Sequence, residues 1–157
     1  MSMTLNPVNE AAFQKAVQSL ETLNRAAVFH PTGTGKSCIA WKVVEAHPQT
    51  TFFWLVAGAQ RLALRQAELT RYNGGTLPGN VRFCDCEKLA AATPEQWVRL
   101  GEQKPGCIVL DCYHELSAVC WAQSVQKLLR MCPQAKVLGL GVPNGAPVCA
   151  AAQELFA

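Results

Sequence analysis

The strongest chemical signal in the sequence is a glycine-rich segment, His30-Pro31-Thr32-Gly33-Thr34-Gly35-Lys36-Ser37. Gly33 and Gly35 let the backbone fold around an anion with its N–H groups pointing inward. Lys36 can reach the outer phosphates of a nucleotide, and the Ser37 hydroxyl can ligate Mg²⁺. The strict phosphate-loop pattern has glycine where this chain has His30, and the rest of the pattern is present. The segment predicts binding of a nucleoside triphosphate, ATP with Mg²⁺.

An acidic residue ends a later apolar run, Ile108-Val109-Leu110-Asp111. A carboxylate at the end of a buried strand can hold the water shell of Mg²⁺ beside a phosphate loop. We therefore predict that Asp111 is the second metal-side residue, together with Ser37. The alternative is that Asp111 only caps the helix that follows.

Short apolar runs and helical patterns alternate along the chain, and they indicate how these residues are positioned. Runs of about four to seven residues are typical of strands covered on both faces. They lie at 26–30, 51–57, 81–84, 107–110 and 136–140. Helical patterns lie at 9–23, 37–46, 59–72, 94–102, 116–131 and 148–156. The alternation predicts an α/β domain with a parallel sheet between helices and its ligand at the carboxyl ends of the strands.

Length and composition fit one globular domain, with a helix at 8–24 before a core at 25–157. Half of the 157 residues are apolar and 16% are charged, which excludes a disordered chain. No apolar run approaches the roughly 18 residues of a membrane span, and the first residues lack the pattern of a signal peptide. We expect a soluble, cytoplasmic protein without a membrane partner. The net charge of +3 permits a nucleic-acid partner but does not indicate one.

The eight cysteines contain no Cys-x-x-Cys pair, so the usual spacing of a zinc site is absent. Cys84-x-Cys86 with a distant histidine is the alternative metal site. Several cysteines fall inside apolar strand or helix patterns, where a free thiol behaves as a small buried apolar group. We favour structural cysteines in a reducing compartment.

The motifs together resemble the first RecA-like domain of superfamily 2 DEAD/DEAH-type helicases, the helicase/UvrB N-terminal and type III restriction-type group. Motif I matches residues 31–37, motif II matches Asp111-Cys112-Tyr113-His114, and residues 137–140 match the approach to motif III. The resemblance implies a single RecA-like P-loop domain that binds ATP and Mg²⁺, with Asp111 and His114 as catalytic residues. It also implies adenine recognition by Asn9, where many members carry glutamine, and contacts to DNA or RNA from the segment 55–66.

Departures from this family pattern bear on catalysis. Cys112 stands where the family has a glutamate that positions or deprotonates the attacking water, and a thiol cannot replace that carboxylate beside Mg²⁺. Gly141-Val142-Pro143 lacks the hydroxyls of motif III, and Asp85 lies where the family offers a threonine to a backbone phosphate. The second RecA-like domain, which brings arginine fingers, is not found in these residues. We therefore expect slow or absent hydrolysis by the chain alone, unless another chain supplies the missing half.

Three interpretations of the function are considered. The chain is either half of a split motor or a non-catalytic nucleotide-binding module, such as a decayed helicase fragment. A small P-loop kinase is disfavoured because no arginine-rich lid segment is found.

Arg61 and Arg65 are the candidate nucleic-acid contacts, but an i, i+4 pair is also typical of a solvated helix face. Trp54 lies in the middle of a predicted strand, so we expect it in the core rather than under a base.

Overall fold

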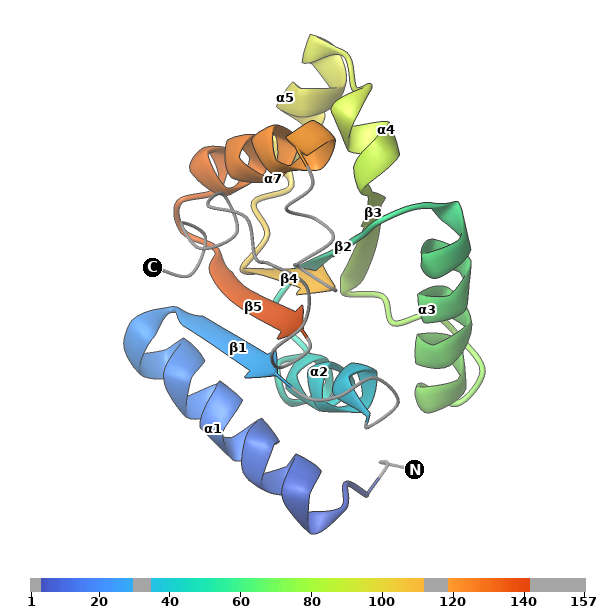
Figure 1. Cartoon of the computed structure of the whole chain (residues 1–157), viewed down its shortest axis with the longest axis vertical. Coiled ribbons are helices and arrows are strands. Elements are labelled where there is room, and N and C mark those ends of the chain that lie inside the picture. Colours follow the sequence, from blue (N-terminus) through green and yellow to red (C-terminus); the bar gives the residue numbers. More distant parts are fainter. Residues whose placement is uncertain (1–3, 30–34, 112–118, 142–157) are drawn as a thin grey trace.

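The computed structural model describes residues 4–29, 35–111 and 119–141, and it has an α/β architecture (Figure 1). Five strands, all parallel, form one sheet in the order β1-β5-β4-β2-β3. The strands are β1 (Arg25–Phe29), β2 (Phe52–Val56), β3 (Val81–Asp85), β4 (Cys107–Asp111) and β5 (Lys136–Gly141). The parallel sheet and the five strand positions predicted from the apolar runs are thereby confirmed.

Helices cover both faces of the sheet, and two apolar clusters separate the layers (Figure 1). On one face lie α1 (Pro7–Leu23), α2 (Lys36–Ala46) and α3 (Ala59–Tyr72). On the other face lie α4 (Cys86–Ala90), α5 (Pro94–Glu102) and α7 (Val119–Met131). Trp54 is fully buried in the first cluster, as expected from its position within a strand. The helix predicted at 148–156 lies outside the described residues.

Local sequence signals explain where α1 and α5 begin. Asn6 caps α1 by accepting a hydrogen bond of 2.8 Å from the backbone N–H of Asn9, and Pro7 follows at the first helical position. Thr93 and Gln96 form a reciprocal capping box at the start of α5. The short helix α4 was not predicted, because five residues are too few to show a helical period.

The chain leaves the two neighbouring strands β2 and β4 in opposite directions at their carboxyl ends. The chain that leaves β2 enters α3 on one face, whereas β4 is followed by α7 on the opposite face. Diverging connections from adjacent parallel strands are the usual place for a ligand in open α/β sheets. Val56 and Asp111 end these two strands, so the fold places Asp111 at this point of divergence.

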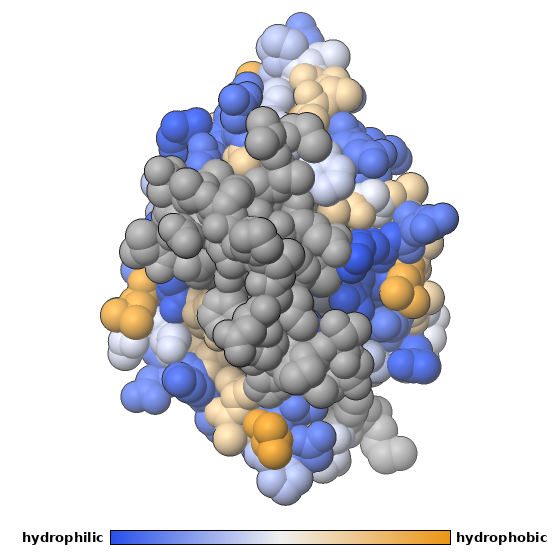
Figure 2. All heavy atoms as spheres, viewed as in Figure 1, coloured by the Kyte–Doolittle hydropathy of each residue, from blue (hydrophilic) through white to orange (hydrophobic). Residues whose placement is uncertain are grey.

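The helices and the exposed apolar side chains of the described residues are the features that bear on a membrane-spanning structure. None of these helices is long and apolar enough to cross a membrane. Figure 2 shows that the apolar residues on the viewed face form separate spots between hydrophilic areas. The large apolar side chains that are exposed are Val8, Leu23, Leu64, Leu77 and Val98.

Burial of a thiol in the sheet makes the fold sensitive to alkaline pH. Cys107 is 3% exposed, and burial raises the pKa of its thiol to about 12 from an ordinary value near 9. The folded state therefore holds a proton that the unfolded chain releases above pH 9. Stability is fully present below pH 9 and is lost as pH rises toward 12, by about 1.4 kcal/mol per pH unit.

We accordingly expect urea unfolding to show a loss of about 2 kcal/mol from this thiol between pH 9 and 10.5. Cys107→Ala should be less stable at pH 8, but its free energy of unfolding should fall less steeply above pH 9. Equal slopes for the two proteins would contradict this prediction.

Candidate functional site

In the described residues, α2 begins without a side-chain cap at its N-terminus. Gly35 is the N-cap residue in a left-handed conformation, with φ of 96°, and no side-chain hydrogen bond caps the helix there. Uncapped N–H groups at a helix start, together with the helix dipole, favour an anion such as phosphate. Of the predicted phosphate-loop residues, Gly35, Lys36 and Ser37 are described, whereas 30–34 (including Pro31, Thr32, Gly33 and Thr34) lie outside the described residues.

Asn9 lies against the last glycine of this loop. Its side chain is buried, and a Cβ atom on Gly35 would come within 2.8 Å of the Asn9 amide nitrogen. The position therefore requires glycine for two reasons, the left-handed backbone and the close approach of Asn9. The helix cap at Asn6 fixes Asn9 in the first turn of α1. The structure thus brings Asn9 to the phosphate-loop region, where the sequence predicted a nucleotide contact.

Asp111 ends β4 as a buried carboxylate whose two oxygens both accept hydrogen bonds from side chains. Its exposure is 3%. Trp54 donates from its indole N–H to Oδ2 over 3.0 Å. Arg65 of α3 donates from Nε to Oδ2, and from Nη2 to Oδ1 over 3.3 Å, which makes the ion pair bidentate. In this structure, the predicted Mg²⁺ ligand is an ion-pair partner.

Arg65 is enclosed between two carboxylates rather than presented to solvent. Its side chain is 16% exposed, and Nη1 also binds Glu68 over 2.9 Å. Burial alone would lower the pKa of Arg65, but hydrogen bonds and charge from Asp111 and Glu68 outweigh it and raise the pKa above its ordinary value. The guanidinium stays protonated at every pH at which the protein is folded.

The second predicted metal ligand also contacts α3. The Ser37 hydroxyl is buried and lies 3.4 Å from the hydroxyl of Tyr72, the last residue of that helix. The Cys38 thiol donates to the same Tyr72 oxygen over 3.2 Å. Arg65, Glu68 and Tyr72 are spaced i, i+3 and i+7, so they lie on one face of α3. One helix therefore engages the side chains of both Ser37 and Asp111.

The two arginines predicted to contact nucleic acid differ in their surroundings. Arg61 is exposed on α3, whereas Arg65 points into the site and is held by Asp111 and Glu68. Sequence reasoning missed this role for Arg65, and it missed Tyr72 and the indole of Trp54. A signal for Arg65 was present, because it shares the apolar stripe of α3 with Leu62 and Leu69. His114 and Cys112 lie outside the described residues.

The remaining sequence candidates have structural roles in the described residues. Asp85 is 6% exposed, and its carboxylate accepts from the backbone N–H groups of Glu87 at 3.0 Å and Gly58 at 3.3 Å. Its charge therefore stabilises the start of α4 and is not presented to a phosphate. Cys84 and Cys86 lie in no group of three or more metal-ligating side chains within the described ranges.

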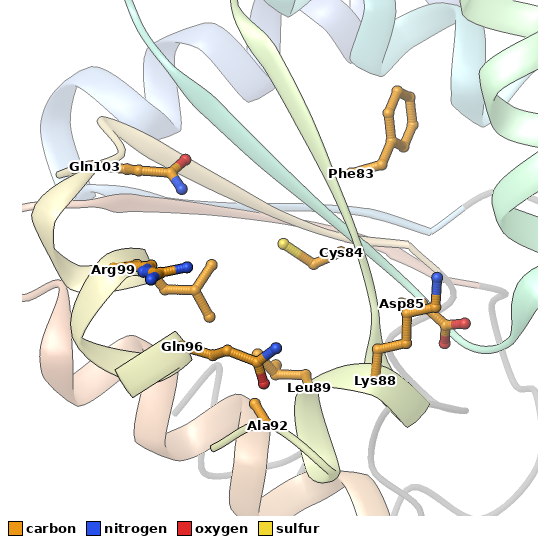
Figure 3. Close-up of a pocket in the computed structure, with 10 residues that line it drawn as sticks. Phe83, Cys84, Asp85, Lys88, Leu89, Ala92, Gln96, Arg99 and Gln103 are labelled. Carbon is orange, nitrogen blue, oxygen red and sulfur yellow. The ribbon is translucent and has the colours of Figure 1, made fainter. Parts of the chain in front are cut away.

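A groove of about 280 Å³ lies elsewhere, between the edge strand β3 and the helices α4 and α5 (Figure 3). Phe83 and Cys84 come from β3, and Gln96, Arg99 and Gln103 surround the groove from the α5 segment. Since β3 and β1 are the opposite edges of the sheet, this groove is separate from the start of α2.

Comparison with known proteins adds no assignment to this geometry. No protein-family model matches the chain, and no curated protein matches it.

Proposed function

We propose that this chain is a nucleotide-binding domain of the DEAD/DEAH-helicase type, which holds ATP at the phosphate loop 30–37. One observation carries the proposal: Gly35, in a left-handed conformation, opens an uncapped helix whose first turn contains Lys36 and Ser37. The helix dipole and the loop N–H groups would bind the phosphates, and Lys36 would reach the outer ones. Asp111, at the end of β4, supports the same location for the site.

A thermal-stability measurement with and without ATP tests this proposal. Ligand at about 100 times its dissociation constant stabilises a folded protein by roughly 2.7 kcal/mol. For a domain of this size, we expect a rise of roughly 5–10 °C in the melting temperature. Lys36→Ala should show no rise over its own ligand-free melting temperature. An equal rise in both proteins, or no rise at millimolar ATP, would reject binding at this loop.

The residues at the proposed site favour ATP binding over ATP hydrolysis. Cys112 replaces the family's catalytic glutamate, and Arg65 holds Asp111. These two features favour the alternative function, a nucleotide-binding module that does not hydrolyse ATP by itself. A second RecA-like domain in trans and a cytoplasmic location remain part of the proposal, as does a DNA or RNA partner. Arg61 stays a candidate contact for that partner, because it is exposed.

A further inference from the structure

Two features of the site disagree about the ligand that it takes. The uncapped start of α2 fits the phosphates of a nucleotide. The residues that would hold Mg²⁺ do not fit the ion as they are arranged, since Arg65 covers both oxygens of Asp111 and Tyr72 contacts the Ser37 hydroxyl. The disagreement concerns the metal alone, and it arises entirely from side chains of α3.

We propose that this chain binds nucleoside triphosphates without a divalent cation, because Arg65 takes the place at Asp111 that the cation would occupy. The inference rests on the proposed nucleotide site and names the form of ligand that the site accepts, the metal-free triphosphate.

The geometry of the Arg65–Asp111 pair makes displacement by Mg²⁺ unfavourable. Mg²⁺ requires near-ideal octahedral coordination and gives up its waters reluctantly. To reach Asp111 it would have to break a bidentate ion pair that the indole of Trp54 also supports. It would then leave a guanidinium that is 16% exposed with Glu68 as its remaining partner. Removing one ion-pair partner of a buried charge costs free energy.

Arg65 also provides positive charge, as the cation does in other phosphate sites. A bare buried carboxylate at the end of β4 would repel a triphosphate bound at the proposed phosphate loop. The guanidinium offsets one of the two negative charges of Asp111 and Glu68, and it does so without a dissociable ion. The dipole of α2 would then favour binding of the phosphates.

The pairing is specified by the fold rather than by a flexible surface contact. Arg65 lies on the inner stripe of α3, between Leu62 and the fully buried Leu69. Glu68 accepts a further hydrogen bond from the guanidinium. Trp54, which is fully buried, donates a hydrogen bond to the carboxylate. Each of the two charged groups is therefore fixed by neighbours other than its partner.

The test is the dissociation constant of ATP, measured by titration calorimetry once with excess Mg²⁺ and once with excess EDTA. For the wild-type chain, we expect the two constants to agree within about threefold. Arg65→Gln frees Asp111, so this variant should bind ATP at least about tenfold more tightly with Mg²⁺ than with EDTA. Arg99→Gln, the same substitution on an exposed part of α5, should behave like the wild type.

Each alternative outcome decides between the two proposals. If Mg²⁺ strengthens ATP binding by the wild type tenfold, the inference is overturned but the nucleotide site is not. The same holds if Arg65→Gln folds and its affinity for ATP gains no dependence on Mg²⁺. Arg65→Lys, which keeps the charge but loses the fork, serves as the second variant if Arg65→Gln does not fold. Its affinity for ATP should show an intermediate dependence on Mg²⁺. An affinity that does not depend on Mg²⁺ would contradict the inference. Absence of ATP binding under both conditions would reject the proposed function itself.

Discussion

Asp111→Ala should destabilise the ligand-free protein by about 3–5 kcal/mol. The substitution removes the acceptor of both Arg65 and Trp54, and these two side chains are 16% and 0% exposed. A buried charge and a buried indole N–H would then be left without that partner, and each such loss is costly. Because Glu68 still contacts Arg65, we expect the lower end of this range. Urea denaturation monitored by tryptophan fluorescence measures the change.

The same pair offers a control that separates ion pairing from general damage. Arg65→Met alone leaves Asp111 buried with the Trp54 indole as its remaining donor, so it should also destabilise the fold. The double variant Arg65→Met/Asp111→Ala removes both charges and should cost less than the sum of the single changes, with a coupling of about 1–3 kcal/mol. Arg99→Ala, on an exposed part of α5, should change stability by less than about 0.5 kcal/mol. Additive effects of the two single variants would contradict the pairing.

The sheet was predictable from the sequence because buried parallel strands have a distinctive composition. The inner strands β2, β4 and β5 are short apolar runs that both helical layers cover, for instance Phe52–Val56, whose five residues are all buried. The strand order was not predictable, because it depends on which strand pairs with which, and local patterns do not encode this. The order places β5 between β1 and β4, so the strand before the phosphate loop and the strand ending in Asp111 are not neighbours.

The candidate site was predictable only as far as its local motifs reach. The glycine of the loop, Lys36, Ser37 and Asp111 follow from residue type and spacing. The partner of Asp111 is 46 residues away in the sequence, and its identity depends on how α3 packs against the sheet. The spacing between Arg61 and Arg65 is typical of an exposed helix face, so it predicts a surface cation. Its distances from Leu62 and Leu69, three and four residues, equally indicated the buried stripe.

We expect the wild-type chain to show no Lys36-dependent ATP hydrolysis. A general base or water-positioning carboxylate typically contributes about 10²–10⁴ in rate, and Cys112, at the position that resembles motif II, cannot supply one. The Arg65–Asp111 pair adds a second obstacle, because phosphoryl transfer in P-loop enzymes uses Mg²⁺ to neutralise the developing charge. Phosphate release with saturating ATP, compared between the wild type and Lys36→Ala, measures this directly.

The two obstacles predict an ordered rescue. Cys112→Glu alone should remain inactive, because the carboxylate that would hold the metal is still paired with Arg65. Cys112→Glu in the Arg65→Gln background restores both a base and a free Asp111, so it should raise Lys36-dependent turnover by about 10² or more. Turnover by the wild type that disappears in Lys36→Ala would show that neither obstacle operates. Activity of Cys112→Glu alone would show that Arg65 yields to Mg²⁺ during catalysis, which would place the functional switch in α3 rather than in motif II.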